Sequence, residues 1–292
     1  MFIADSAVIG TGPAGISAAI NLSIRKKTFY LLGNSSLSDR IEKSVKIDNY
    51  PGYFGISGRE FNDRLREHME KLDVKITEAK VTGIYDLGGY FGILADREQF
   101  YARTVIIATG AEAVKPVPGE REFLGRGVSY CATCDGRLYK GRKIAVICDN
   151  EAMEHEAEYL ADLAETVYFF SSYKSSYERE NVVRISGKVK AVAGSDAVQS
   201  VEYGDGERIE VDGVFFLKHA VAADVLLRGL EVSDGRIVTG KNMETSVKGC
   251  FAAGDCTGTP YQIAKAVGEG NVAAHSVISY IATNGKESND GN

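Results

Sequence analysis

The sequence lacks the features that mark several classes of protein. No apolar run approaches the roughly 18 residues that a transmembrane helix needs. Met1–Ser6 contains no basic residue ahead of the first apolar stretch, which argues against a signal peptide. Positive charge is not in excess, because 34 Lys and Arg stand against 40 Asp and Glu, and this argues against a general nucleic-acid binder. We therefore expect a cytoplasmic protein that binds neither membrane nor nucleic acid.

Proline and cysteine are also scarce. With only five prolines, the 32 glycines are predicted to form turns and phosphate-binding loops rather than flexible linkers. The five cysteines are an odd number, which argues against a structural disulfide framework. Two of them, Cys131 and Cys134, have C-x-x-C spacing, which in an intracellular α/β protein indicates a redox-active or metal-binding pair.

The order of apolar strands and periodic helices predicts two α/β domains. A length of 292 residues is itself consistent with about two. Strands are expected at residues 6–10, 28–32, 104–108, 143–147, 166–170 and 250–253. Helices are expected at 151–163 and, the longest, at about 262–282. Pro116 and Pro118 mark one crossing between domains, and residues 244–249 a second. The predicted first domain is therefore residues 1–114 with 245–292, and residues 115–244 form a second domain inserted into it.

A glycine-rich turn follows the first predicted strand and precedes a predicted helix. The pattern is G-x-G-x-x-G, and its residues include Gly10, Gly12, Pro13, Ala14 and Gly15. Such glycines allow a tight turn and a close approach of the backbone to a pyrophosphate, which lies at the helix N-terminus. The turn therefore predicts dinucleotide binding. The usual acidic ribose ligand after the second strand is replaced by a Gly-Asn pair at 33–34, so the ribose contact stays unassigned.

Two further strand ends support a flavin dinucleotide. Gly254 and Asp255 follow an apolar strand and precede the longest helix, where a carboxylate is suited to hold a ribityl chain. Taken alone, Asp255 is better explained as a capping residue in a strand–turn–helix connection. Together with the N-terminal glycine turn and the strand end Ala108, Thr109 and Gly110, it indicates FAD.

The hexapeptide of residues 131–136, Cys-Ala-Thr-Cys-Asp-Gly, is the predicted chemical centre. Cys131 and Cys134 are close enough in sequence to form a small disulfide, and Asp135 beside them is a candidate proton carrier. A zinc site would need two more ligands, and neither the other cysteines nor the four histidines supply a second close pair. We therefore predict no metal, and interpret Cys148, Cys250 and Cys256 as packed, inert thiols.

These motifs, with Asp48-Asn49-Tyr50-Pro51-Gly52, resemble in order and spacing the low-molecular-weight thioredoxin reductases of bacterial type. The resemblance implies an α/β fold of two Rossmann-like, doubly wound, three-layer domains in a homodimer, with FAD in the domain formed by both termini. It also implies that Cys134 lies next to the flavin, that Cys131 attacks thioredoxin and that Asp135 is the acid/base. The positions that match flavin contacts in the family are Gly10, Gly12, Gly15, Asn49, Asp255 and Gln262.

One departure from the family pattern concerns the electron donor. In place of a second glycine loop, the inserted domain has Cys148-Asp149-Asn150-Glu151-Ala152-Met153, and further carboxylates follow at Glu154 and Glu156. Carboxylates at a helix N-terminus suit the helix dipole but would repel a pyrophosphate. Ser171-Ser172-Tyr173 stand where the family has a cationic cluster for the 2′-phosphate of NADPH, so no guanidinium remains there. We therefore expect no NADPH site.

A flavin disulfide reductase without a nicotinamide site resembles the ferredoxin-dependent flavin thioredoxin reductases. The leading hypothesis is therefore that reduced ferredoxin reduces FAD, the flavin reduces the Cys131–Cys134 disulfide, and Cys131 exchanges with thioredoxin. Three alternatives remain: an FAD dithiol oxidase that uses oxygen, an NADPH-dependent thioredoxin reductase with atypical motifs, and a non-catalytic flavin sensor. Two basic clusters, residues 25–27 and 137–143, are candidate docking sites for ferredoxin, although each is better explained as a solvated face.

Overall fold

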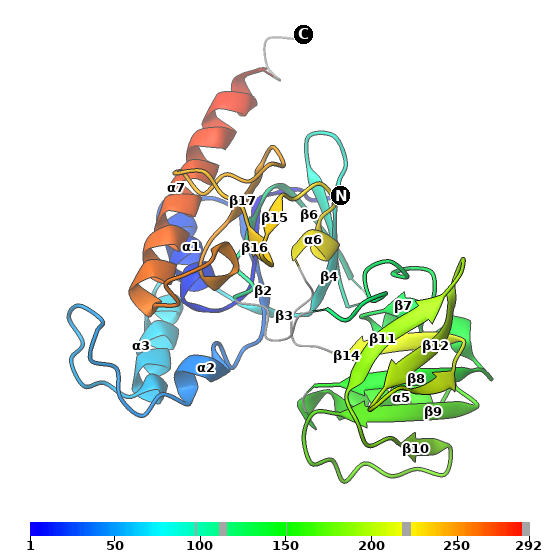
Figure 1. The fold of residues 1–292 in the computed structure, drawn as a ribbon. Coiled ribbons are helices and arrows are strands. Elements are labelled where there is room, and N and C mark those ends of the chain that lie inside the picture. The colour runs from blue at the N-terminus through cyan, green and yellow to red at the C-terminus, as the bar shows by residue number, and fades with distance from the viewer. Residues whose placement is uncertain (97, 111–115, 150, 218–222, 288–292) are drawn as a thin grey trace. The chain divides into compact units, whose positions relative to one another are not determined.

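The chain forms two units. One is built from two separate segments of the sequence, and the other from a single continuous segment. The computed structural model describes residues 1–96, 98–110, 116–149, 151–217 and 223–287 (Figure 1). Unit 1 consists of Met1–Glu112 and Ala222–Asn292, and unit 2 consists of Ala113–Val221. The second unit is therefore inserted into the first.

The second boundary between the units differs from the prediction at residue 245. Residues 223–244 belong to unit 1, where Leu227 forms a parallel bridge with Ile84. The prediction was wrong here because the strands of this segment are only two residues long, too short for their periodicity to show where they pack. Lys115 of the predicted connector lies outside the described residues.

Unit 1 is built on a seven-stranded sheet. Its path is β3-β2-β1-β6-β5-β4, and β17 also pairs with β6. The strands are β1 (Ala4–Ile9), β2 (Phe29–Gly33), β3 (Thr77–Glu78), β4 (Val81–Asp86), β5 (Phe91–Ala95), β6 (Glu98–Ile107) and β17 (Cys250–Ala252). β1, β2, β3, β6 and β17 pair in parallel, whereas β4, β5 and β6 pair antiparallel. β17, most of β1 and the second half of β6 are buried, because other elements cover both faces of the sheet there.

The helices of unit 1 pack on this sheet around an apolar core. They are α1 (Pro13–Ile24), α2 (Asp39–Glu42), α3 (Gly58–Lys71), α6 (Ala223–Leu226) and α7 (Ile263–Glu287), with a small hairpin of β15 (Val232–Ser233) and β16 (Arg236–Ile237). α1 and α7 lie side by side (Figure 1), and small residues such as Ala18 and Ala273 are fully buried in the core that they share. The Ser17 hydroxyl donates a hydrogen bond to the Val267 carbonyl across this contact (2.7 Å). Residues from the two ends of the chain therefore form one core.

Unit 2 combines a parallel sheet with a smaller antiparallel one. The five-stranded sheet has the order β10-β9-β8-β14-β7, and all of its pairs are parallel. The elements are β7 (Val128–Ser129), α4 (Ala132–Asp135), β8 (Lys143–Cys148), α5 (Glu154–Ala161), β9 (Thr166–Ser171), β10 (Val182–Arg184), β11 (Val189–Gly194), β12 (Val198–Tyr203), β13 (Glu207–Glu210) and β14 (Gly213–Leu217). β11, β12 and β13 form the antiparallel sheet. α5 buries Ala157 and Leu160 against β8 and β9.

This architecture confirms the predicted fold class, an α/β protein with two Rossmann-like units. In each unit a buried parallel strand, β1 or β8, leads toward a helix, and the carboxyl ends of the strands form the edge at which such folds bind ligands. Over the described residues, no helix has both the length and the apolarity that a membrane crossing would demand.

Candidate active site

The redox pair lies between β7 and the short helix α4 in unit 2. Cys131 and Cys134 form a disulfide, with their Cα atoms 5.3 Å apart. Cys131 is the N-cap residue of α4, and its Sγ accepts a hydrogen bond from the Cys134 backbone N–H (3.2 Å). Cys131 is buried, whereas Cys134 is exposed. The two sulfurs therefore differ in exposure, and that of Cys131 receives an N–H group that would stabilise a thiolate.

Ser129, at the end of β7, links the predicted proton carrier to the redox pair. Its hydroxyl donates a hydrogen bond to Asp135 Oδ2 (2.6 Å) and lies 3.2 Å from the Cys131 carbonyl oxygen. The same hydroxyl accepts from the Cys131 backbone N–H (3.0 Å). Ser129 therefore holds the Asp135 carboxylate in one position. Sequence reasoning missed this residue because a serine two positions before a C-x-x-C motif carries no recognisable signal.

The glycine turn of unit 1 has the geometry that the sequence predicted. Gly10 has φ 115°, and a Cβ at this position would lie 2.3 Å from the Ala108 carbonyl oxygen. A Cβ at Gly15 would lie 1.9 Å from the Gly10 carbonyl oxygen, so both glycines are required by the packing of the turn. By contrast, a Cβ at Gly12 would meet no atom within 4 Å. The protein itself does not require Gly12, which leaves open space in front of the N-terminus of α1.

That open space fits a pyrophosphate. α1 begins with Pro13 directly after its N-cap residue Gly12, and no acidic residue lies in its first turn. The N–H groups of Ala14 and Gly15 have no intrahelical acceptor, because the first such bond runs from Ile16 to the Gly12 carbonyl. A phosphate at this position would receive both N–H groups and the positive end of the helix dipole.

The turn after β17 brings several predicted site residues together. Asp255 follows Gly254, and its Oδ2 accepts a hydrogen bond from Arg40 of α2 (3.1 Å). Partial burial raises the pKa of Asp255 above its ordinary value, although the Arg40 guanidinium opposes this shift. Asn49 Nδ2 donates to Gln262 Oε1 (2.5 Å), so these two residues, far apart in the sequence, are adjacent.

A lysine and a glutamate on the first turns of α7 hold this turn in place. Lys265 Nζ donates to the Gly254 carbonyl, the Thr257 hydroxyl and the Gly258 carbonyl, at 2.8 Å in each case. Glu269 pairs with Lys265 (3.0 Å) and accepts from the Gly254 backbone N–H (2.8 Å). These residues were not predicted, because their role depends on contacts between a turn and a helix that sequence periodicity does not reveal.

The strand ends of β6 and β17 are joined by a buried thiol. Cys256 Sγ donates to the carbonyl oxygens of Ile107 (3.4 Å) and Ala253 (3.3 Å). Burial raises the pKa of Cys256 to about 12, and likewise that of Cys250 to about 12. Both thiols, together with Cys148, are buried and outside any disulfide, as expected of packing residues. Ala108, Thr109 and Gly110 follow β6, and Gly110 has φ 78°.

The corresponding turn of unit 2, after β8, is occupied by a protein carboxylate. Glu154 Oε1 accepts hydrogen bonds from the Tyr173 hydroxyl (2.8 Å) and the Ser175 hydroxyl (2.5 Å). The Tyr173 hydroxyl also lies 3.4 Å from Cys148 Sγ, at the end of β8. Desolvation and these hydrogen bonds raise the pKa of Tyr173 far above its ordinary value, so it remains a neutral donor. Polar groups that could face a nucleotide are thus engaged with a carboxylate of the chain itself.

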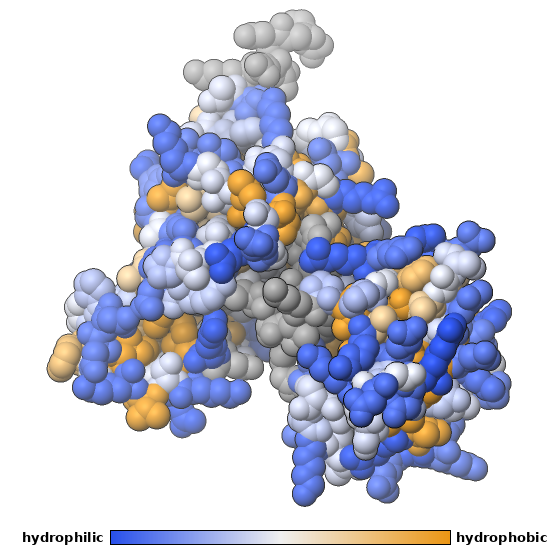
Figure 2. All heavy atoms as spheres, in the orientation of Figure 1, coloured by the Kyte–Doolittle hydropathy of each residue, from blue (hydrophilic) through white to orange (hydrophobic). Residues whose placement is uncertain are grey.

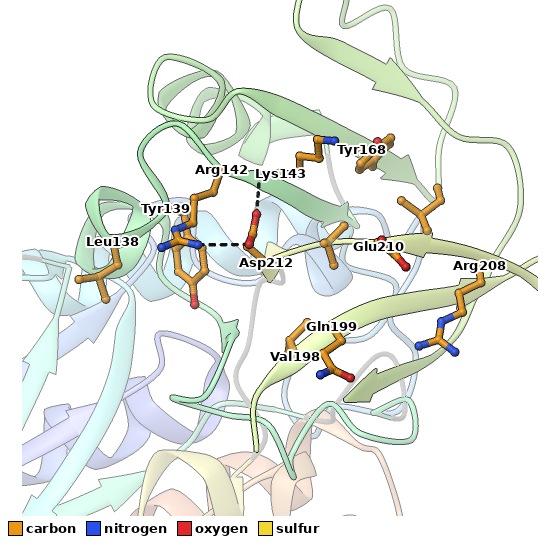
Figure 3. A pocket seen from close by; sticks show the side chains of 12 residues that line it. Leu138, Tyr139, Arg142, Lys143, Tyr168, Val198, Gln199, Arg208, Glu210 and Asp212 are labelled. Atoms are coloured by element: carbon orange, nitrogen blue, oxygen red, sulfur yellow. Dashed lines mark hydrogen bonds and ion pairs between the residues drawn. The ribbon is translucent and has the colours of Figure 1, made fainter. Parts of the chain in front are cut away.

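Unit 2 also contains an open cavity of about 1100 Å³ between its two sheets (Figure 3). Its wall includes Leu138, Tyr139, Tyr168, Arg208 and a pair formed by Arg142 and Asp212 (3.3 Å). Its lining contains no predicted catalytic or flavin-binding residue, but it includes Arg142 and Lys143 of the basic cluster at residues 137–143. Among the described residues, no group of three or more His, Cys, Asp and Glu side chains is arranged to hold a metal ion.

Comparison with known proteins identifies the family. The chain matches the pyridine nucleotide-disulphide oxidoreductase family over residues 4–148 and 172–270. It is 34% identical over 299 residues to a thioredoxin reductase from Treponema pallidum (strain Nichols), covering 96% of this chain and 97% of the relative. It is 30% identical over 300 residues to a thioredoxin reductase from Bacillus subtilis (strain 168), covering 96% of this chain and 95% of the relative.

The solved structures point to a more specific resemblance. One crystal structure of a ferredoxin-flavin thioredoxin reductase from Clostridium acetobutylicum has a TM-score of 0.90 and 40% identity, and covers 97% of this chain and 99% of that chain. A second structure of such a protein from the same organism has a TM-score of 0.85 and 42% identity, covering 96% and 98%. With the family match and the Cys131–Cys134 disulfide, these findings show that the chain belongs to the pyridine nucleotide-disulphide oxidoreductase family as a thioredoxin reductase-like flavoprotein disulfide oxidoreductase.

Proposed function

We propose that this protein binds FAD and reduces thioredoxin with electrons from reduced ferredoxin, in the cytoplasm and as a homodimer. The observation that carries the choice of donor is the position of Glu154, whose carboxylate accepts hydrogen bonds from Tyr173 and Ser175 beside the end of β8. A dinucleotide at this edge would need N–H groups and cations for its phosphates. Instead it would meet the Glu154 carboxylate, and the residues Ser171-Ser172-Tyr173 at the end of β9 include no guanidinium.

The similarity to the two ferredoxin-flavin thioredoxin reductase structures supports the same donor. The family match also breaks at residues 149–171, the segment that contains the turn after β8, α5 and β9. Two kinds of observation, the contacts of Glu154 and the similarity to these structures, therefore favour a carrier protein over a pyridine nucleotide.

The residues of unit 1 fit a flavin dinucleotide. The pyrophosphate would lie at Gly12, Pro13, Ala14 and Gly15, where open space meets free N–H groups. Asp255 would accept from the ribityl chain, while Asn49, Gln262 and the strand ends at Ala108–Gly110 and Gly254 would surround the remainder. When bound, FAD would supply the ability to accept electrons one at a time and pass them on as a pair.

The two cysteines divide the thiol chemistry between them. Two electrons and two protons cleave the Cys131–Cys134 bond to give two thiols, and Asp135 is positioned to carry a proton to or from them. The Cys131 thiolate then attacks the thioredoxin disulfide, forming a mixed disulfide and releasing one thioredoxin thiolate. Cys134 attacks the Cys131 sulfur of the mixed disulfide, which releases the second thioredoxin thiol and restores the Cys131–Cys134 bond.

The test is a turnover assay without oxygen, with thioredoxin thiols as the readout. We expect thiols to form when reduced ferredoxin is supplied and not when NADPH or NADH is supplied. The Cys134→Ser variant is the matched control, because it keeps the flavin site but cannot complete the exchange. Thiol formation from NADPH at a rate comparable to that from ferredoxin would overturn the proposal. Oxygen consumption with a small dithiol, and no thioredoxin reduction, would instead establish a dithiol oxidase.

A further inference from the structure

An apolar surface with basic neighbours lies on unit 1 between α2 and α3. Val45 and Phe54 are 90% and 83% exposed, although both are large hydrophobic residues, and Tyr53 is 41% exposed. Figure 2 shows hydrophobic atoms gathered over α2, α3 and the loop between them, surrounded by hydrophilic ones. We call Val45, Tyr53, Phe54 and the cations Lys43 and Lys46 the α2–α3 surface. Exposed apolar groups gathered in this way are typical of a binding surface.

The α2–α3 surface is continuous with the candidate flavin residues. Asn49 belongs to the same loop and donates to Gln262 (2.5 Å). Arg40, at the start of this segment, pairs with Asp255 (3.1 Å), and its guanidinium lies 5.8 Å from the centroid of the Tyr261 ring. A protein bound to the α2–α3 surface would therefore contact the residues that border the flavin.

Charge on this segment is opposite in sign to that of the chain as a whole. Residues 43–54, which contain the α2–α3 surface, have two cations, Lys43 and Lys46, against one carboxylate, Asp48, whereas the whole chain has a net charge of −6. Asp48 is paired with Lys46 (2.9 Å), which leaves the charge of Lys43 in excess. The remaining positive charge would attract an acidic partner and repel a second copy of the same surface.

We propose that the α2–α3 surface is the docking site of the electron donor, an acidic one-electron carrier protein of the ferredoxin class. This inference rests on the proposed function, because only a protein donor needs a surface beside the flavin residues. An apolar centre with a charged rim is the usual composition of such interfaces, and the cations would steer the acidic donor toward it. Lys46 lies 5.0 Å from the centroid of the Phe54 ring, so charge and apolar area form one patch.

The test compares flavin reduction by ferredoxin with reduction by dithionite, a small reductant that needs no docking surface. In the holoenzyme, Lys43→Glu with Lys46→Glu should slow reduction by ferredoxin roughly tenfold or more at low salt, with a smaller effect at high salt. Reduction by dithionite should change by less than about twofold. Phe54→Ser, which alters no charge, should slow the ferredoxin reaction at low and high salt alike. Arg25→Glu with Lys26→Glu is the matched control, because it reverses two exposed charges at the far end of α1.

Each outcome bears on a separate claim. If ferredoxin reduces the unaltered protein but is equally fast with Lys43→Glu/Lys46→Glu, the docking surface is overturned and the proposed function stands. If the Arg25→Glu/Lys26→Glu control slows ferredoxin more than the test variant does, the donor binds at the end of α1 instead. If Phe54→Ser converts dimers to monomers, measured by light scattering, the surface is an interface between copies of this chain. If ferredoxin reduces no variant and not the unaltered protein, the proposed function fails.

Discussion

At the redox pair, one hydrogen bond supports the proposal that Cys131 is the attacking thiol. Because Cys131 Sγ accepts from the Cys134 N–H, a thiolate at Cys131 would be stabilised once the disulfide is reduced. We predict that reduced Cys134→Ser traps a mixed disulfide with thioredoxin, seen as a band of added mass on a non-reducing gel. Thioredoxin turnover should be lost in this variant. A trapped complex with Cys131→Ser, and none with Cys134→Ser, would reverse the assignment.

The three remaining cysteines predict a simple labelling pattern. Burial raises the pKa of Cys250 and of Cys256 to about 12, so both remain protonated thiols at neutral pH, and Cys148 is fully buried. After reduction of the folded protein at neutral pH, we expect iodoacetamide to label Cys131 and Cys134 alone, as counted by mass spectrometry. In denaturant, all five cysteines should be labelled. Rapid labelling of Cys256 in the native protein would contradict the packing of the β6 and β17 strand ends.

The Asp255 carboxylate is expected to destabilise the folded apoprotein and to strengthen flavin binding. Because burial raises its pKa, the folded apoprotein binds this proton more tightly than the unfolded chain does. Above the folded-state pKa, the ionised Asp255 carboxylate therefore lowers the free energy of unfolding. Below the unfolded-state pKa, Asp255 is protonated in both states and this destabilisation is absent. Asp255→Asn should raise the melting temperature of the apoprotein near neutral pH but not in acid.

The same variant should weaken FAD binding roughly ten- to a hundredfold, through loss of a charged acceptor. An unchanged FAD affinity would show that Asp255 does not belong to the flavin site.

Some of the site could be predicted from single residues and some could not. Gly10, Gly15 and the Cys131–Cys134 pair were recognisable because steric need and chemistry restrict those positions to one residue type. Ser129 and Lys265 were not, because serine and lysine are common at surfaces and turns. Their roles come from contacts with Asp135 and with the turn after β17, which form only in the folded chain.

At the scale of elements, the turn between β1 and α1 offers a matched pair of variants. Gly15→Ala places a Cβ 1.9 Å from the Gly10 carbonyl oxygen, and overpacking of this kind should destabilise the apoprotein by about 1–3 kcal/mol. Gly12→Ala meets no protein atom within 4 Å and has an allowed φ of −76°, so apoprotein stability should change by less than about 0.5 kcal/mol.

The same pair separates folding from cofactor binding. Since Gly12 borders the proposed pyrophosphate, Gly12→Ala should lower FAD affinity roughly tenfold or more while the fold is retained. Thermal unfolding of the apoprotein and flavin titration followed by fluorescence measure the two effects separately. A Gly12→Ala protein that binds FAD as tightly as the unaltered chain would place the pyrophosphate elsewhere.

The elements with strong patterns were predicted well and the short ones were not. The strand expected at 143–147 is β8 (Lys143–Cys148), and the helix expected at 262–282 is α7 (Ile263–Glu287). The helix expected at 151–163 was only partly right, because α5 begins at Glu154 after a 3-10 turn. Residues 223–244 were assigned to the wrong unit, since their packing depends on distant partners such as Ile84 rather than on local periodicity.

For the molecule as a whole, the two units carry the same architecture with opposite chemistry at the strand ends. Unit 1 leaves open space at the N-terminus of α1, whereas unit 2 fills the turn after β8 with the hydrogen-bonded carboxylate of Glu154. Both units would thus have a dinucleotide-binding fold, but only unit 1 would bind a dinucleotide. The inserted unit would retain its redox pair for exchange with thioredoxin, and electrons would enter through unit 1.

The most direct test of this central claim is the absorbance of the flavin in the oxidised holoprotein, followed without oxygen during additions of NADPH and then of reduced ferredoxin. We predict that the flavin keeps its oxidised spectrum with NADPH, even in large excess, and bleaches on addition of ferredoxin. Rapid bleaching by stoichiometric NADPH would contradict the account, because a nucleotide would then have reached the flavin despite the carboxylate at the end of β8.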